Sequence, residues 1–337
     1  MPARARRLAG IGLLAGIALL TALLAWRGFT EVGRALAMAG TGLIVLALYH
    51  LVPLGLDAAG WRALLPATAR ASRRRVMLAR WIGESVNTLL PVVQIGGPVV
   101  RTRILIQAGV PVATAAASVV VDLTLIILPQ ILFTVLGIVA LASVLGEQTL
   151  VVPATIGTVL MAGSVAGFIA LQRRGLFGVI ARPLQKLGAS GALADVVANA
   201  DELDARVREI YANRRATGAA VGAHLASWVA GTGEVWLCLQ FLGHPVRLAD
   251  ALLLESLIQA VRAAAFVVPG ALGVQEGAVV LLGATLGLSP DTALALSLSK
   301  RCRELLLGVP GLVVWQVGEA RGMISGQAAQ DRGGAEA

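Results

Sequence analysis

Long apolar segments alternate with short charged segments along this chain. Apolar stretches with no charge, or with only a few charged positions, cover residues 8–26, 35–56, 123–146, 148–172, 216–242 and 292–317. An α-helix rises about 1.5 Å per residue, so about 20 apolar residues cross the hydrocarbon core of a bilayer. The pattern therefore predicts an all-α polytopic membrane protein with about six spanning helices.

Composition supports a membrane protein and argues against a secreted one. The chain has 337 residues, of which 57% are hydrophobic and 14% charged, more apolar surface than a soluble fold of this length buries. The first apolar stretch follows three arginines, as a signal peptide does, but no small-residue cleavage site follows it. Trp26 and Arg27 are instead typical of an interfacial anchor, so we expect the stretch to remain as a helix.

The basic residues predict the orientation of the chain. Six arginines and no acid lie between Asp57 and Glu84, and eight basic residues lie in the stretch 173–215. Because cytoplasmic loops are rich in Lys and Arg, both stretches and both termini are expected in the cytoplasm, and a nucleic-acid partner is not needed to explain the net charge of +9. Apolar positions at helical spacing over about 193–211 predict an amphipathic cytoplasmic helix. It either packs under the bundle or binds anionic head groups, and residues 322–337 are expected to be a disordered tail.

Two apolar stretches, residues 81–98 and 251–288, are interrupted by helix-breaking or polar residues. The interruptions are Asn87, Pro91, Gly96, Gly97 and Pro98 in the first stretch, and Pro269, Gly270, Gly273 and Glu276 in the second. Broken backbone at membrane depth is tolerated only where protein or a water-filled cavity satisfies it. Each stretch is therefore predicted to be a re-entrant helical hairpin.

The two broken stretches match one another at an offset of 178 to 179 residues. Pro91 falls on Pro269 at the first offset, and Asp122 falls on Arg301 at the second. By the predicted orientation, the first hairpin enters from the cytoplasm and the second from outside. Together with the match, this predicts an inverted-topology repeat, with halves at about 81–172 and 251–317 in a single membrane domain, 1–321. Transporters place their substrate between such halves. Chance matches in a chain rich in Gly, Pro and Ala are the alternative.

Several charged residues lie inside the apolar segments, where each costs about 2.5–3.5 kcal/mol at the bilayer centre unless it is paired or hydrated. They are Asp122, Glu234, Glu255, Arg262, Glu276, Lys300, Arg301, Arg303 and Glu304. One interpretation is that they form buried ion pairs that fix helix register. The other is a binding site in which Arg262, Arg301 and Arg303 donate to an anionic or hydroxylated head group.

In the second interpretation, Asp122, Glu234 and Glu276 balance the arginines or carry protons. Arg101 and Arg103 follow the first break and are expected to guard the cytoplasmic mouth of the site, unless they are ordinary positive-inside residues.

Other chemistry has little support in the sequence. The chain lacks a nucleotide-binding loop and hydrolase motifs, so transport is expected to be passive, ion-coupled or driven by a partner. Cys238 and Cys302 sit in apolar segments, and the three histidines are far apart in sequence. No metal and no cofactor are therefore expected.

Four motifs carry a resemblance to a known family. They are GGPVVR at 96–101, ASVVVD at 117–122, VPGALGVQEG at 268–277 and RCREL at 301–305. In these motifs the chain resembles the flippase-like membrane region of lysylphosphatidylglycerol synthases, the family that includes the multiple peptide resistance factor. Within it, residues 266–275 and 294–315 are most similar to stand-alone membrane proteins associated with hopanoid biosynthesis.

This resemblance implies a bacterial inner-membrane protein that translocates polycyclic or glycerol lipids. Its implied partners are membrane lipids and lipid biosynthetic enzymes. Many members have Asp where this chain has Pro98, which puts an acidic role there in doubt. No aminoacyl-transferring domain is expected after Trp315, so lysyl transfer is not expected. The alternatives are a non-transporting lipid-binding subunit or scaffold and, less favoured, an intramembrane enzyme that uses Glu276 or Asp122 as acid or base.

Overall fold

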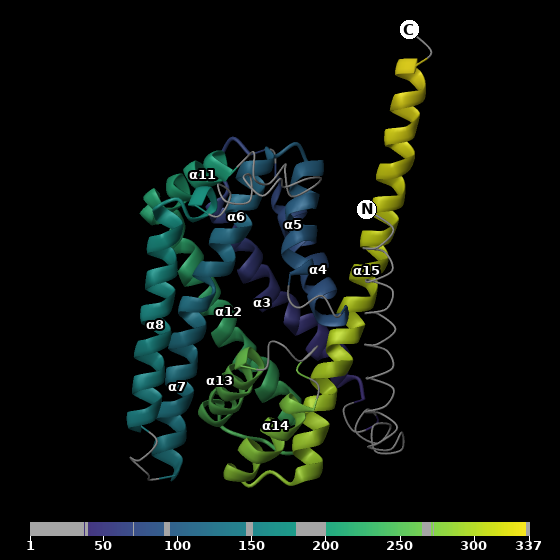
Figure 1. Ribbon diagram of the computed structural model, residues 1–337. Helices are drawn as coiled ribbons and strands as arrows, with labels where there is room; N and C mark the ends of the chain where they lie inside the picture. Colours follow the sequence, from purple (N-terminus) through teal and green to yellow (C-terminus); the bar gives the residue numbers. More distant parts are fainter. Residues whose placement is uncertain are drawn as a thin grey trace.

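The computed structural model describes residues 37, 40–69, 71–90, 95–145, 151–179, 200–264, 271 and 273–334. Within these ranges every long regular element is an α-helix (Figure 1). In chain order the helices are α3 (Gly42–Leu64), α4 (Arg73–Leu89), α5 (Gly96–Gln107), α6 (Val112–Leu125), α7 (Ile127–Leu145), α8 (Val151–Arg173), α11 (Ala200–Ala212), α12 (Arg214–Phe241), α13 (Leu248–Ala264), α14 (Val274–Thr285) and α15 (Pro290–Gly334).

Two groups of three consecutive helices, α4–α6 and α13–α15, resemble one another. Their first two helices match in length, and the same kind of turn precedes the third helix. Helices α4 and α13 each have 17 residues, and α5 and α14 each have 12. Both short helices end at a glycine in the left-handed region, Gly109 with φ +85° and Gly287 with φ +74°. In each case the next amide bonds back across the turn, Val110 N to Leu105 O at 3.1 Å in the first group. Proline then follows within three residues and opens the next long helix, α6 or α15.

The two groups lie at opposite ends of the molecule. The turn between α5 and α6 is at the end that carries α11, and the turn between α14 and α15 is at the other end (Figure 1). Helices α3 and α12, which precede the two groups, pack against one another. They run antiparallel, because Gly42 lies against Phe241 and Gly60 against Ala220. The packed helices α3 and α12 therefore connect the two matching helix groups.

The two central glycines of the first broken segment lie in a helix rather than in a break. Helix α5 begins at Gly96, and Asn87 Oδ1, from the last turn of α4, accepts a hydrogen bond from Gly97 N at 2.7 Å. A Cβ on Gly97 would lie 2.4 Å from the carbonyl oxygen of Gly83. Glycine is needed here for the close crossing of α4 and α5, which the sequence did not distinguish from a need for flexibility.

The remaining helices cover the flank and one end of these groups. Helices α7 and α8 pack side by side, and α11 contacts α6 and α8. The apolar face of α11, with Leu203, Val207 and Ile210, packs against Val121 and Leu125 of α6. This agrees with packing of α11 beneath the bundle, and residues 193–199 of the predicted amphipathic helix lie outside the described residues.

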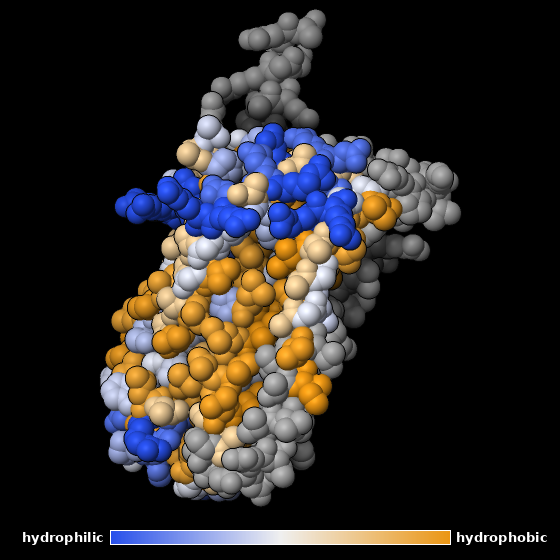
Figure 2. Space-filling model, turned by 90° about the vertical axis from the view of Figure 1, so that its left-hand side faces the viewer, coloured by the Kyte–Doolittle hydropathy of each residue, from blue (hydrophilic) through white to orange (hydrophobic). Residues whose placement is uncertain are grey.

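The outer surface between the two ends is largely apolar. Figure 2 shows hydrophobic side chains covering the flank and hydrophilic side chains gathered at the ends. Among the described residues, Gly42–Leu64 and Val112–Ala142 are long and apolar enough to cross a membrane. Only 39% and 28% of the residues in their most apolar segments are buried inside the protein. Exposed apolar residues also lie along α8 and α15, for example Val159, Phe168 and Val313. This surface is suited to contact with lipid tails.

Several sequence-based boundaries differ from those of the helices. Helix α3 continues past the predicted end at residue 56 to Leu64. It does so because Asp57, which ended the uncharged window, is paired inside the protein. Helix α15 continues to Gly334, beyond the predicted domain boundary at 321. The stretch 8–26, Pro91, Pro269 and Gly270 lie outside the described residues.

Candidate functional site

A cavity of about 330 Å³ lies between the two helix groups. Its wall includes seven charged or titratable side chains: His50, Arg80, Glu84, Arg101, Arg262, Arg303 and Glu304. They come from α3, α4, α5, α13 and α15. Asn87 and Pro98, at the facing ends of α4 and α5, also line the cavity. The cavity is thus polar, and its wall contains four guanidinium groups and two carboxylates.

One charged cluster, the Asp122 cluster, comprises Asp57, Arg80, Arg101, Asp122 and His224. Asp122 has no exposed surface and accepts from Arg101 at 2.5 Å, and its other oxygen lies 3.0 Å from His224 Nε2. Asp57 joins the same groups from α3, at 2.7 Å from Arg80 Nη2 and at 2.7 Å from His224 Nδ1. Every carboxylate in this cluster therefore has at least two partners, as buried charges require.

Trp61 fixes Arg101 in the wall of the cavity. The Arg101 guanidinium lies 4.0 Å from the centre of the Trp61 ring, a cation–π contact. Trp61 is fully buried, and its Nε1 donates to Ser118 Oγ at 3.2 Å. Ser118 and Asp122 are four residues apart on α6, so one helix face holds the tryptophan and its arginine together.

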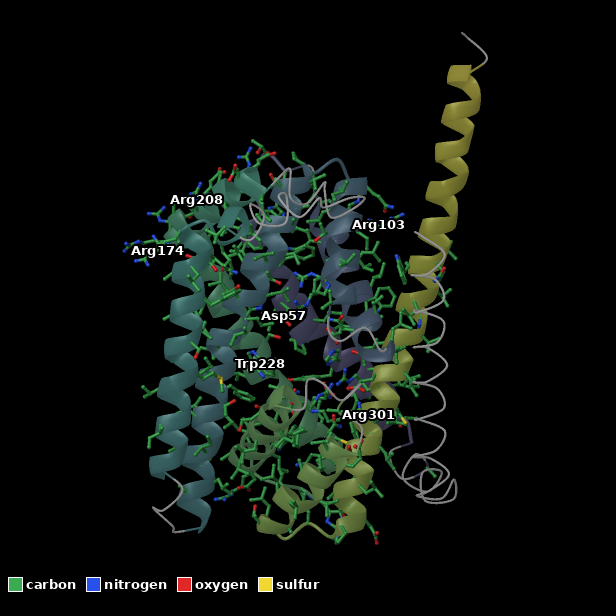
Figure 3. All side chains as sticks on the ribbon, in the orientation of Figure 1. Asp57, Arg103, Arg174, Arg208, Trp228 and Arg301 are labelled. Carbon is green, nitrogen blue, oxygen red and sulfur yellow. The ribbon has the colours of Figure 1, made fainter. Side chains whose placement is uncertain are left out.

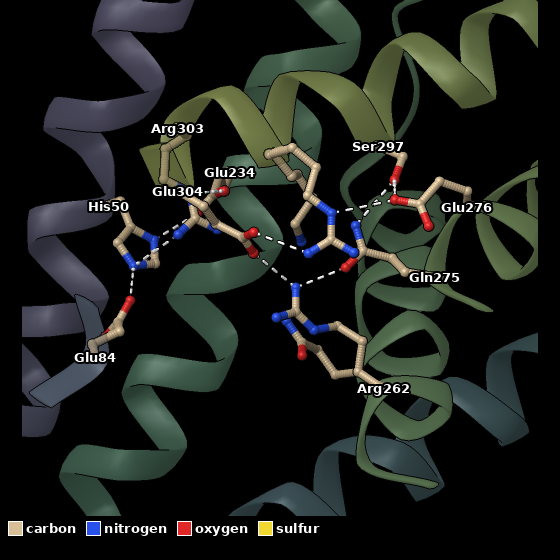
Figure 4. Close-up of polar contacts among 12 residues, drawn as sticks. His50, Glu84, Glu234, Arg262, Gln275, Glu276, Ser297, Arg303 and Glu304 are labelled. Atoms are coloured by element: carbon tan, nitrogen blue, oxygen red, sulfur yellow. Dashed lines mark hydrogen bonds and ion pairs between the residues drawn. The ribbon is translucent and has the colours of Figure 1, made fainter. Parts of the chain in front are cut away.

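A second cluster, the His50 cluster, comprises His50, Glu84, Glu234 and Arg303 (Figure 4). The two ring nitrogens of His50 lie 2.8 Å from Glu234 Oε2 and 2.9 Å from Glu84 Oε1. Arg303 donates from Nε to Glu234 Oε1 at 2.9 Å, and its Nη1 lies 3.2 Å from His50 Nε2. This cluster joins α3, α4, α12 and α15 at the cavity.

A row of alternating charges continues from the cavity wall into the protein (Figure 4). Arg262 donates to Glu304 Oε1 at 3.0 Å, and Arg301 donates to the other Glu304 oxygen at 3.1 Å. Arg301 also donates to Glu276 at 3.2 Å. The second oxygen of Glu276 accepts from Gly273 N at 2.7 Å and so caps α14. Glu276 thus serves as a helix cap and as the far end of this row.

One further ion pair lies behind the second cluster. Lys300 of α15 donates to Glu255 of α13, and both side chains are buried. Glu255 also accepts from Gln259 Nε2 at 2.7 Å, and Gln259 lines the cavity. The pair holds the long helix α15 to the first helix of its own group.

The predicted site residues fall into three groups in the structure. Arg101, Arg262, Arg303 and Glu304 line the cavity. Asp122, Glu234, Glu255, Glu276 and Arg301 lie behind this wall as partners of other charges. Arg103 is exposed on α5 and lies away from the cavity (Figure 3). Ion pairs therefore form much of the cavity wall, and the binding of a head group there stays a prediction.

Sequence reasoning missed five members of the two clusters: His50, Asp57, Arg80, Glu84 and His224. A signal was present in part, since His50 and Asp57 are seven residues apart on a mostly apolar helix and so share a face. Arg80 was counted with the cytoplasmic arginines, although Glu84 lies one helical turn after it. The described part of the chain contains no group of three His, Cys, Asp or Glu side chains positioned for a metal ion.

Comparison with known proteins finds one family that matches most of the chain. The sequence profile of the family described as the lysylphosphatidylglycerol synthase TM region matches residues 11–311. No curated protein and no solved structure matches the chain. The matched range contains both clusters and the whole wall of the cavity.

Proposed function

The chain belongs to the family of lysylphosphatidylglycerol synthase TM regions, and from that premise we propose that it translocates a lipid whose head group enters the cavity. The observation that carries the proposal is the cavity wall, where Arg80, Arg101, Arg262 and Arg303 come from four different helices. Guanidinium groups bind phosphate through paired hydrogen bonds. The head group is therefore proposed to be anionic.

The surroundings of the cavity support an anionic head group. Each arginine in the wall contacts a carboxylate or an aromatic ring of the protein, so its position is fixed before a ligand arrives. Pro98 places the amino-terminal turn of α5 at the cavity, where the helix dipole favours negative charge. A phosphate fits this lining better than the hydrocarbon skeleton of an unsubstituted hopanoid, so a glycerol phospholipid is the favoured substrate.

We further propose that the pairs α4–α5 and α13–α14 are re-entrant hairpins of an inverted repeat. Their equal helix lengths and opposite positions support this (Figure 1). A substrate cavity between inverted halves allows the halves to rock and expose the cavity to each side in turn. The proposed location is the bacterial inner membrane with both termini in the cytoplasm.

Reconstituted protein tests the proposal. Vesicles of phosphatidylcholine with a trace of head-labelled phosphatidylglycerol report translocation as label that becomes accessible to an impermeant quencher. Arg262→Gln and Arg303→Gln should slow translocation at least about tenfold, because each removes a charged hydrogen bond worth about 1.5–3 kcal/mol. Arg103→Gln, on the exposed face of α5, should translocate as the unchanged protein does.

Two other functions predict different results. A lipid-binding subunit or scaffold would bind phosphatidylglycerol without moving it, and the labelled lipid would stay protected. An intramembrane enzyme would need a carboxylate that faces the cavity with a free oxygen. Asp122 and Glu276 do not line the cavity, and both oxygens of each already accept hydrogen bonds, which disfavours that function.

A further inference from the structure

One nitrogen of His50 has two partners with opposite requirements. Nε2 lies 2.9 Å from Glu84 Oε1, which requires a proton between the two atoms. The same nitrogen lies 3.2 Å from Arg303 Nη1, which only donates and therefore requires a lone pair on Nε2. We propose that His50 and Glu84 form a proton-binding site in the cavity wall and that this proton is transported together with the lipid.

Each protonation state of this site gives Nε2 one hydrogen-bond partner. With the proton present, Nε2–H donates to Glu84, while Nδ1–H donates to Glu234 at 2.8 Å. On release, the Nε2 proton passes to Glu84 Oε1 and then to water in the cavity. The lone pair left on Nε2 accepts from Arg303, and the Nδ1–H bond to Glu234 is unchanged. Release therefore exchanges the Nε2 hydrogen bond to Glu84 for one from Arg303, and the Glu84 carboxylate, 34% exposed, is hydrated from the cavity, which keeps both states accessible.

His224 shows the contrasting arrangement. Its Nδ1 and Nε2 lie 2.7 Å from Asp57 and 3.0 Å from Asp122, and among the described residues no donor hydrogen bonds to its ring. Loss of a proton would leave a lone pair facing a carboxylate, with no described donor placed to bond it as Arg303 bonds His50. Arg80 and Arg101 approach those two carboxylates instead of the imidazole. We therefore expect His224 to keep its proton and to link the two carboxylates structurally, so the two histidines differ in function.

The His50 site is also the one that the cavity reaches. The side chains of His50 and Glu84 are 14% and 34% exposed, whereas His224 and Asp122 are both 0% exposed. The helices packed against α3 present Arg80 and Glu84 from α4, Glu234 from α12 and Arg303 from α15. Asp122 of α6 is occupied by Arg101 and His224. Glu84 is therefore the acceptor through which a proton enters or leaves.

Arg303 couples this proton to the lipid, a step that rests on the proposed function. A phosphate in the cavity attracts the Arg303 guanidinium away from Nε2, while Nε of Arg303 stays on Glu234. Without its donor, Nε2 holds a proton more firmly and bonds Glu84. Binding of the anionic head group and binding of the proton therefore favour each other, and this linkage is reciprocal.

Transport under a pH gradient tests the coupling. A pH difference of one unit biases a cycle that moves one proton with each lipid about tenfold. Translocation of labelled phosphatidylglycerol in phosphatidylcholine vesicles should therefore be several-fold faster with the gradient in one direction than in the other. His50→Gln and Glu84→Gln should give equal rates in both directions. His244→Gln, a loop residue bonded to Thr292, should keep the full difference.

Imidazole ¹⁵N NMR tests the proton site without transport, because the chain has only three histidines. As the pH rises from about 6 to about 11, the signal that is lost in His50→Gln should change from the cationic to the neutral form. Short-chain phosphatidylglycerol should move that change to higher pH, and the His224 signal should stay cationic. A His50 signal that never changes form would overturn the inference.

The two proposals fail in distinguishable ways. Translocation by the unchanged protein that ignores the gradient would overturn proton coupling and leave the lipid translocase standing. A complete absence of translocation would overturn the translocase, and with it lipid coupling, while the NMR titration would still decide whether His50 exchanges a proton.

Discussion

At the scale of single residues, hydrogen bonds to oppositely charged partners hold the buried charges of the two clusters in place. Asp122 meets Arg101 and His224, and Glu234 meets Arg303 and His50. Each carboxylate receives charged hydrogen bonds from different helices, so the ion pairs also fix how those helices pack. The same pairing leaves the guanidinium groups pointed at the cavity with little freedom to move. Stability and the proposed lipid binding therefore depend on the same side chains.

Replacement of Asp122 tests this dependence. Asp122→Asn keeps the size of the side chain but removes the charge that faces Arg101 and His224, and Asp122 has no exposed surface. The unfolding free energy should fall by about 3–5 kcal/mol, the usual effect of breaking a buried ion pair. Thermal unfolding in detergent measures the loss. Glu209→Gln breaks the exposed pair with Arg206 and should change stability by no more than about 1 kcal/mol; equal effects of the two variants would contradict the argument.

At the scale of helices, the two groups use one arrangement with the charges exchanged. Arg80 of α4 approaches Asp122 of α6 at 3.5 Å, and Glu255 of α13 pairs with Lys300 of α15. Arg80 and Glu255 are 175 residues apart, as are the first residues of α4 and α13. Asp122 and Lys300 are 178 residues apart, as are the first residues of α5 and α14. An ion pair thus joins the first and third helices of each group at matching positions.

Charge exchange in the second group tests the equivalence. Glu255→Lys alone places two ammonium groups together in a buried position and should sharply reduce the yield of folded protein. Glu255→Lys combined with Lys300→Glu restores one acid and one base, in the order found in the first group. The double variant should recover about 1–3 kcal/mol relative to the sum of the single changes. Thermal unfolding of all three proteins gives this coupling, and strict additivity would show that the pair does not join the two helices.

At the scale of the whole molecule, the sequence predicted individual helices better than it predicted the contacts between them. Hydropathy placed α8 and α12 within three residues of their ends, because burial in lipid depends on the segment itself. The second broken stretch, 251–288, contains α14, whereas the first, 81–98, ends within the first turn of α5. The partners of His50 and Asp57 were missed, because they lie on helices far away in the chain. Asp57 thus ended the predicted span early, although Arg80 and His224 pair with it inside the protein.

The orientation of the molecule remains a prediction that labelling can decide. Helix α12 has 28 residues and is about 42 Å long, enough to cross the bilayer. Arg174 and Arg208 lie near its amino-terminal end (Figure 3), and the Arg247 side chain, 79% exposed, follows its other end. With Cys238 and Cys302 replaced by Ala, Arg247→Cys should react with an impermeant maleimide on intact spheroplasts. Arg208→Cys should react only after lysis.

Each labelling result has a definite consequence for the proposed mechanism. Reaction of Arg208→Cys alone on intact spheroplasts would invert the molecule, so that α4–α5 enters from outside and any proton gradient acts in the opposite sense. Reaction of both cysteines on intact spheroplasts would mean that α12 does not cross the membrane. The His50 and Asp122 clusters depend on α12 for Glu234 and His224, so that outcome would also remove the cavity from the bilayer and contradict lipid translocation.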